Sequence, residues 1–289
     1  MIVGSVGESI SIEGQVTPDQ VVNYFSRRYV PDFEVGGEDP RASIVWKLGR
    51  PGVIVEERGK SRFVIRSDYP EPYRNEHPYF FLLQVFSRLY EESGRILLSD
   101  SVVFSSGKEG VVVMGGPHSG KSTLLYLAIL NGFIPLSNEN SVFSLKGGKL
   151  VFEGGATTFT FSRRAAKYGS VVLDGTTRSG YGYVDLRKFD RKRVTIKGLF
   201  YIHSSFSSKG FDMEKISGRK VKKLLWSHAS SVIRGTEFYS PYPPDLSSED
   251  LNRARAERIS DVADFYGDSF YEVFGAHDAI FEFVKEFLR

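Results

Sequence analysis

The sequence predicts an α/β protein, and two observations lead to this prediction. The first is the stretch VVVMGGPHSGKST at residues 111–123, where a run of apolar β-formers leads into a glycine-rich loop and then into a helical pattern. The second is a change of pattern near Ile96, because short alternating strands dominate before it and strands mixed with helices follow it. We therefore expect a β-rich α+β region at residues 1–95, packed against an α/β domain at residues 96–289.

The composition describes an ordinary globular chain and excludes several kinds of chemistry. Hydrophobic residues make up 41% and charged residues 25% of the 289 positions, which is enough for a sizeable core. The 38 basic and 35 acidic side chains give a net charge of only +3, spread along the chain, so we expect no nucleic-acid partner. The sequence has no cysteine, which excludes disulfides, thiolate metal sites and a cysteine nucleophile.

The first residues lack the features of a targeting signal. The start MIVGSVGESISIEG carries two glutamates and has neither a basic segment nor an apolar one. The longest apolar stretches, such as Leu124 to Leu130, are far shorter than the roughly 18 residues that a membrane span needs. We therefore expect a cytoplasmic protein without a membrane partner.

Residues 1–95 show the patterns of four strands and two helices. The strands correspond to the runs ESISIEG, SIVWKL, GVIVEE and SRFVIRS. A helix is expected at Asp19 to Phe25, after a proline that is typical of a helix start. The apolar stretch Tyr79 to Glu92 predicts a second helix that ends before Gly94, and its density of aromatic residues favours core packing over a ligand surface.

From Ile96 onward the expected strands and helices follow one another closely. The pair Gly147 and Gly148 predicts a hairpin turn between SVFSL and KLVFE. The helix after the glycine-rich loop is expected to end near Leu130. The remaining expected elements are strands at 101–104, 110–114, 133–136, 170–173, 182–186 and 195–203 and helices at 247–266 and 277–288.

Residues 115–122 carry the strongest chemical signal, because they satisfy the pattern G-x-x-x-x-G-K-[ST]. Glycine at 115 and 120 permits a close approach that a Cβ would forbid, so loop N–H groups and the helix N-terminus can converge on phosphate oxygens. Lys121 supplies a cation for the β- and γ-phosphates, and the Ser122 hydroxyl is placed to bind Mg²⁺. The alternatives are a plain glycine turn with a solvated lysine and, for His118, a catalytic role. The expected phosphate-binding residues are Gly115, Gly116, Pro117, His118, Ser119, Gly120, Lys121, Ser122 and Thr123.

Two polar stretches follow the loop. The strand expected at 133–136 comes directly after Gly132 and leads to Asn138, Glu139 and Asn140. Such a strand brings polar groups to the phosphate end of the sheet, which places Glu139 near the metal or the attacking hydroxyl. The second stretch runs from Arg178 to Leu186, contains two glycines and an aspartate, and precedes a basic segment and a strand.

The sequence resembles the catalytic domain of HPr kinase/phosphorylase and its P-loop kinase-like relatives. The resemblance depends on three features in this order: the loop, the pair 138–139 and the stretch 178–186. The resemblance covers roughly residues 96–205. It implies a P-loop fold of the HPr kinase/phosphoenolpyruvate carboxykinase type. It also makes Arg178 a candidate contact to the phosphate or the acceptor, with a surface arginine as the alternative.

The sequence departs from that family at two positions. The family's first aspartate, the expected base, corresponds to Asn138, and asparagine cannot take a proton. The family's histidine before the loop strands would fall near Ser99 or Asp100, where the sequence has none. Glu139 is then the only carboxylate at the two positions where the family has a pair of aspartates.

Several other charged residues have a functional and a structural interpretation. Asp100 could act as a further carboxylate, and Asp185 could hold Mg²⁺ or cap a turn. The basic residues between Lys215 and Lys223 could contact phosphates, although we interpret them as a solvated helix face. We interpret His228 as a structural histidine.

The sequence thus predicts an ATP-dependent phosphotransferase that passes the γ-phosphoryl group to a hydroxyl. Lys121, Glu139 and Arg178 are the expected catalytic residues, and Ser122 and Glu139 are the expected Mg²⁺ ligands. The alternative is a nucleotide-binding regulatory or scaffold protein that has lost the catalytic base. The acceptor is a small molecule or a protein serine, and the resemblance permits a homo-oligomer.

Overall fold

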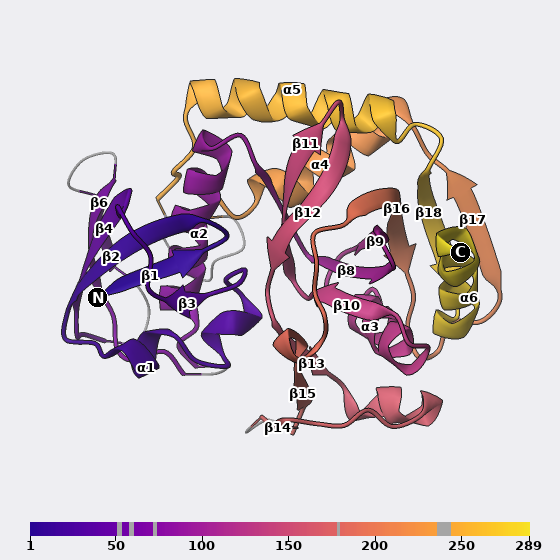
Figure 1. The fold of residues 1–289 in the computed structure, drawn as a ribbon, viewed down its shortest axis with the longest axis horizontal. Coiled ribbons are helices and arrows are strands. Elements are labelled where there is room, and N and C mark those ends of the chain that lie inside the picture. The colour runs from indigo at the N-terminus through magenta and orange to yellow at the C-terminus, as the bar shows by residue number, and fades with distance from the viewer. Residues whose placement is uncertain (51–53, 58–60, 72–73, 178–179, 236–243) are drawn as a thin grey trace.

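The structure of the protein, a computed structural model, describes residues 1–50, 54–57, 61–71, 74–177, 180–235 and 244–289. It is a mixed α/β fold in which the described strands form three sheets. Figure 1 shows the N-terminal sheet on one side of the molecule and the largest sheet on the other, with helix α5 (Glu249–Phe265) across the top. Among the described helices, none combines the length and the apolar character that a membrane crossing needs.

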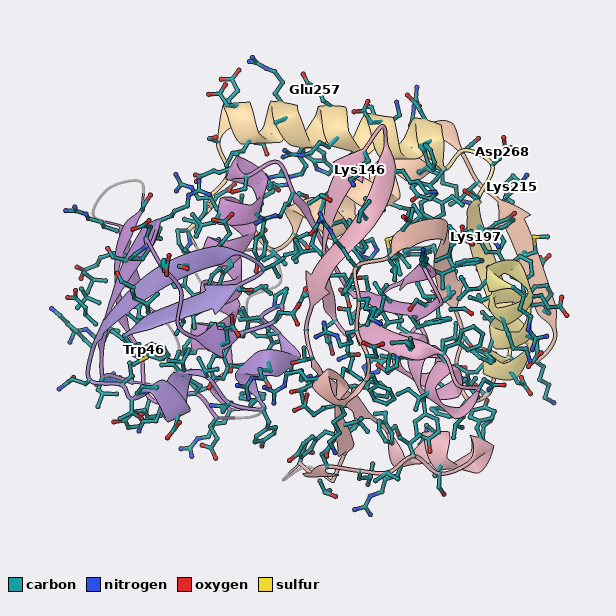
Figure 2. The ribbon with its side chains drawn as sticks, in the orientation of Figure 1. Trp46, Lys146, Lys197, Lys215, Glu257 and Asp268 are labelled. Carbon is teal, nitrogen blue, oxygen red and sulfur yellow. The ribbon has the colours of Figure 1, made fainter. Side chains whose placement is uncertain are left out.

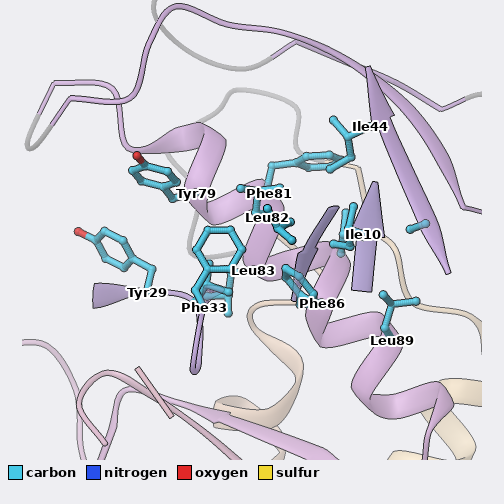
Figure 3. Close-up of a cluster of buried hydrophobic side chains, with 14 of the residues drawn as sticks. Ile10, Tyr29, Phe33, Ile44, Tyr79, Phe81, Leu82, Leu83, Phe86 and Leu89 are labelled. Carbon is cyan, nitrogen blue, oxygen red and sulfur yellow. The ribbon is translucent and has the colours of Figure 1, made fainter. Parts of the chain in front are cut away.

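The N-terminal sheet is built from β1 (Ile2–Ser5), β2 (Glu8–Gly14), β3 (Glu34–Val35), β4 (Ala42–Lys47), β5 (Ile54–Glu57) and β6 (Arg62–Arg66), in the order β3-β1-β2-β4-β6-β5. β1 and β2 form an antiparallel hairpin, whereas β2, β4 and β6 run parallel to one another. Helix α2 (His77–Glu92) packs on this sheet. Figure 3 shows Phe81 and Phe86 of α2 gathered with Ile10 and Ile44 of the sheet in one apolar cluster.

The large sheet is built from β7 (Ile96–Ser99), β8 (Ser101–Ser106), β9 (Glu109–Met114), β10 (Ile134–Ser137), β11 (Asn140–Lys146), β12 (Lys149–Gly155), β16 (Thr195–His203), β17 (Phe211–Lys215) and β18 (Phe270–Gly275). Its order is β10-β8-β9-β16-β12-β11-β7, with β18 beside β16 and β17 beside β18. β9, β16 and β18 run parallel, and the other pairs are antiparallel. The carboxyl ends of these three strands therefore meet at one edge, where α/β sheets bind ligands.

Helices cover both faces of the parallel strands. Val111 and Val113 of β9 pack with α3 (Lys121–Leu130) and α6 (His277–Leu288), whereas Val112 and Met114 pack with α4 (Gly218–Ser230) and α5. Successive side chains of a strand point to opposite faces, so a strand covered on both faces is apolar at every position. This explains the continuous apolar run before the glycine-rich loop.

A buried ion pair links α5 to α2. Arg255 is fully buried, and its guanidinium donates from Nε to Oε1 of Glu91 at 2.6 Å and from Nη2 to Oε2 at 2.8 Å. The bidentate geometry gives each carboxylate oxygen a charged donor, which is the condition under which a buried pair is tolerated. The N-terminal region and the rest of the chain are therefore connected by packing and by paired charges.

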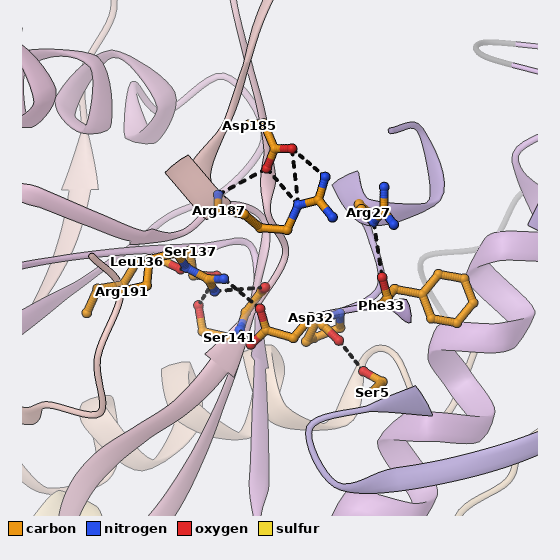
Figure 4. Close-up of polar contacts among 12 residues, drawn as sticks. Ser5, Arg27, Asp32, Phe33, Leu136, Ser137, Ser141, Asp185, Arg187 and Arg191 are labelled. Atoms are coloured by element: carbon orange, nitrogen blue, oxygen red, sulfur yellow. Dashed lines mark hydrogen bonds and ion pairs between the residues drawn. The ribbon is translucent and has the colours of Figure 1, made fainter. Parts of the chain in front are cut away.

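The segment 26–33, which begins with the 3-10 helix η1 (Ser26–Arg28), lies against the edge of the large sheet (Figure 4). The N–H of Asp32 donates to the carbonyl of Gly155 at 3.0 Å, and Nη1 of Arg191 donates to the Asp32 carboxylate at 2.6 Å. Nε of Arg191 also donates to the carbonyl of Leu136 at 2.8 Å. These contacts hold η1 beside the connection between β10 and β11.

Most of the predicted elements are confirmed, including β16 and α6 with the predicted bounds. The helix predicted at Asp19 to Phe25 is confirmed at its start but is shorter than predicted, because α1 (Pro18–Val21) ends after a single turn. The side chain of Asn23 then accepts hydrogen bonds from the N–H groups of Phe25 and Ser26, which replaces further helical hydrogen bonds. The predicted strand 170–173 is wrong, since this segment is irregular and Val172 is 86% exposed.

A small third sheet pairs β13 (Thr158–Phe161), β15 (Gly182–Asp185) and β14 (Gly175–Thr176).

Candidate functional site

The glycine-rich loop connects β9 to α3 at the carboxyl edge of the parallel strands. Gly120 precedes the helix with φ = +99°, a conformation that a residue with a Cβ adopts only at a cost. A Cβ at this position would also lie 2.8 Å from Nε2 of His277. The carbonyl of Ser119 accepts a hydrogen bond from the N–H of Ser204 at 2.9 Å. The loop is thus held by the segments that follow β16 and β18.

Lys121, the first residue of α3, directs its ammonium group at three oxygens. Nζ donates to the carbonyls of Gly115 at 2.6 Å and Gly116 at 2.8 Å, and it lies 3.3 Å from Oδ1 of Asp100. A buried ammonium group needs an oxygen partner for each of its protons, and this geometry supplies them. Because the helix N-terminus is itself positive, a cation held there makes a point that attracts anions.

Two tight connections between strands carry carboxylates beside the loop. Asp100 joins β7 to β8 with φ = +49°, and Glu139 joins β10 to β11 with φ = +66°. The N–H of Ser101 donates to the carbonyl of Glu139 at 3.0 Å, so the two connections lie next to each other. Left-handed φ values are uncommon outside glycine, and such strain clusters at functional sites.

The N-terminal region contributes an arginine to this place. Nη2 of Arg28 lies 3.3 Å from Oε1 of Glu139, and both side chains are mostly buried. The amide of Asn140 donates to the carbonyl of Tyr29 at 2.9 Å, which fixes η1 against the same connection. Arg28 is 111 residues from Glu139 in sequence, and no local pattern indicated the pairing.

Asn138 lies in the connection between β10 and β11, where it is buried. Its N–H donates to the carbonyl of Ala156 at 3.0 Å, and its side-chain amide donates to the carbonyl of Thr158 at 3.4 Å. The side chain is almost fully buried, and Oδ1 has no hydrogen-bond partner among the described residues. A carboxylate here would face the Thr158 carbonyl without a proton to share, which gives a physical reason for an amide at this position.

His228, on α4, lies beside Ser99 and Asp100 in the structure, although no histidine is near them in the sequence. Its Nδ1 lies 2.8 Å from the carbonyl of Ser99, which can only accept, so Nδ1 donates. Burial lowers the pKa of His228 below its usual value, and the nearby Lys121 acts in the same direction. The imidazole is therefore neutral and hydrogen-bonded, in agreement with a structural histidine.

Other residues singled out from the sequence have structural partners. Asp185 caps the 3-10 helix η3 (Leu186–Lys188) by accepting a hydrogen bond from the N–H of Arg187 at 3.0 Å. Figure 2 shows Lys215 beside Asp268, and this ion pair spans 3.5 Å. Arg178 lies outside the described residues. The basic stretch 215–223 spans the end of β17 and the start of α4.

The oxygens near Lys121 suit a hard divalent cation. Ser122 is half-exposed in the first turn of α3, and the carboxylates of Asp100 and Glu139 lie on the neighbouring connections. Within the part of the chain that the structure describes, no three histidine, aspartate or glutamate residues come together as a metal site. This arrangement fits Mg²⁺, which takes one or two protein ligands and completes its shell with phosphate oxygens and water.

Comparisons with known proteins find a distant similarity to solved structures. No family model matches the sequence, and no curated protein matches it. Among solved structures, the HPr(Ser) kinase/phosphatase from Coxiella burnetii is 15% identical, with a TM-score of 0.25, over 42% of this chain and 77% of that chain. At this distance the similarity carries little weight, and the interpretation of the site depends on its own geometry.

Proposed function

We propose that the protein binds a nucleoside triphosphate at residues 115–123 and transfers the γ-phosphoryl group to a hydroxyl acceptor. The observation that supports this most is the position of Lys121 between the loop carbonyls and Asp100, beside the connection that carries Glu139. A helix N-terminus, an ammonium group and two carboxylates at one sheet edge are the groups that phosphoryl transfer uses.

The roles follow from these positions. Lys121 and the loop N–H groups hold the β- and γ-phosphates. Ser122 with Asp100 or Glu139 would hold Mg²⁺, which would neutralise the charge of the phosphates. Because the site has two carboxylates, one can hold the metal while the other acts as the base. Asp100, which contacts Lys121, would take the metal-binding role, and Glu139 would act as the base toward the acceptor.

The transfer moves one phosphoryl group and one proton. The acceptor oxygen forms a bond to the γ-phosphorus, the bond from that phosphorus to the bridging oxygen breaks, and the nucleoside diphosphate leaves. The hydroxyl proton passes to the carboxylate of Glu139 and from there to water. Arg28, 3.3 Å from Glu139, orients this carboxylate. Positioning and charge stabilisation supply most of the rate enhancement in such reactions.

Calorimetry with ATP, with and without Mg²⁺, tests the proposal when ADP release is followed in the same samples. We expect Lys121→Ala to weaken binding at least tenfold, whereas Lys222→Ala, a lysine on α4 paired with Asp264, leaves it unchanged. Glu139→Gln should keep binding and lose turnover, with the solvent-exposed Asp268→Asn as its control. Absence of binding by the wild type, or binding that does not depend on Lys121, would contradict the proposal.

The second candidate is a nucleotide-binding regulatory protein without transfer activity. Its support is the buried amide of Asn138, which cannot act as a base and is hydrogen-bonded within the sheet. Binding that depends on Lys121, without ADP release for any hydroxyl acceptor, would favour this candidate.

A further inference from the structure

The two sides of the glycine-rich loop differ in chemistry. On the side of β8 and β10, the neighbouring connections carry Asp100 and Glu139. On the other side, the carboxyl ends of the parallel strands β16 and β18 lead into the segments 204–210 and 275–277. A nucleotide whose γ-phosphate lies toward the carboxylates can extend its nucleoside toward the segments after β16 and β18.

Three aromatic rings and a lysine gather on that second side. The ring centroid of Phe206 lies 4.9 Å from that of His277, and that of Tyr168 lies 6.4 Å from it. Nζ of Lys167 is 4.6 Å from the ring centroid of Tyr168 and 5.2 Å from that of Phe206. Phe206 and Tyr168 are half-buried and Lys167 is exposed, so this aromatic cluster is partly open to solvent.

His277 connects the aromatic cluster to the loop. It begins α6, its Nε2 would contact a Cβ on Gly120 at 2.8 Å, and only 2% of the residue is exposed. Its Nδ1 is buried and has no hydrogen-bond partner among the described residues. Burial, with the nearby positive charge of Lys167, lowers the pKa of His277 to about 4, so the ring is neutral at pH 7. An unpartnered polar atom at this depth is costly unless a ligand supplies the missing hydrogen bond.

We infer that the aromatic cluster of Lys167, Tyr168, Phe206 and His277 receives the nucleobase of the bound nucleotide. The inference depends on the proposed function, since it places the other end of the same ligand. Bases stack on aromatic faces, and a cation near the rings strengthens the contact. Phe206 provides the stacking face, Lys167 the cation, and Nδ1 of His277 a polar contact at the edge of the base.

Binding of two ligands by the same variants separates this inference from the proposed function. ATP carries a base and inorganic triphosphate does not, whereas both can contact the loop and Lys121. We expect Phe206→Leu, which keeps the apolar volume and removes the ring, to weaken ATP binding roughly tenfold and to leave triphosphate binding unchanged. Lys121→Ala should weaken both ligands. Phe265→Leu, a 47% exposed aromatic on α5, serves as the matched control.

The outcomes are distinct. ATP affinity unchanged in both Phe206→Leu and Lys167→Met, in a protein that binds triphosphate, would overturn the inference and leave the proposed function standing. Equal losses for ATP and triphosphate would also overturn it, because the cluster would then act on the loop and not on a base. A wild type that binds neither ligand would overturn the proposed function and this inference together. Thermal unfolding of each variant establishes that the fold is retained.

Discussion

Replacement of Gly120 by alanine tests the geometry of the loop directly. The residue has φ = +99°, and a non-glycine residue in a left-handed conformation costs about 1–2 kcal/mol. The new Cβ would lie 2.8 Å from Nε2 of His277 and 3.1 Å from Cβ of Ser204, and His277 is buried and cannot move into solvent. Overpacking of this kind costs about 1–3 kcal/mol. We therefore expect Gly120→Ala to lower the free energy of unfolding by about 2–5 kcal/mol.

Gly107→Ala is the matched control for backbone strain alone. Gly107 lies in the turn between β8 and β9 with φ = +60°, and a Cβ there would meet nothing within 4 Å. It should cost only the strain, about 1–2 kcal/mol. Thermal unfolding measures both variants, and a loss of 1 kcal/mol lowers the Tm by roughly 2–4 °C in a chain of this size.

Nucleotide binding gives the second measurement. We expect Gly120→Ala to lose ATP binding, because the displaced loop no longer directs its N–H groups at one point, while Gly107→Ala keeps it. If the two variants lose the same stability, the contact with His277 is not a constraint. If Gly120→Ala binds ATP as the wild type does, the loop geometry is not what holds the phosphates.

Three further predictions concern charges. Arg255→Met and Glu91→Gln should each cost about 3–5 kcal/mol in urea unfolding, and the double variant should cost much less than their sum, because each single change leaves a buried group unpaired. The depressed pKa of His277, about 4, means that the unfolded chain binds more protons than the native one below pH 6.5. Stability should therefore fall as the pH drops from 6.5 toward 4, and urea midpoints of His277→Gln should lack this component. Glu139→Gly should abolish ADP release and change the free energy of unfolding by no more than about 1 kcal/mol, because relief of the strained φ offsets the lost Arg28 pair.

The parts of the fold that the sequence predicts are those with a local physical cause. The glycine-rich loop follows from steric requirements within eight residues, and β9 follows from burial on both faces. β17 was not predicted, since its pattern FDMEK alternates between apolar and polar residues over only four positions and all five of its side chains are exposed. The helix predicted at Asp19 to Phe25 ends early, at Val21, for a local reason as well, because the Asn23 side chain competes for backbone N–H groups.

The positions of Arg28 beside Glu139 and of His228 beside Ser99 could not be predicted, because these residues come from distant parts of the chain. Arg28 is 111 residues from Glu139, and His228 is 129 residues from Ser99. Their positions depend on how η1 and α4 pack on the large sheet. The sequence indicated candidate residues along one strand–loop–helix unit. It contained no signal for the partners that tertiary packing brings to that unit.

Three of the six non-glycine residues with positive φ among the described residues lie at the candidate site. Asp100, His118 and Glu139 all have positive φ, and all three lie in or beside the glycine-rich loop. A glycine at these positions would adopt the same conformation without the penalty. Val6, Asp32 and Asp39 have positive φ as well, so the strain by itself assigns no role. What sets Asp100 and Glu139 apart is that their carboxylates are paired with Lys121 and Arg28, on the two neighbouring connections to which the proposed function assigns the carboxylates of the transfer.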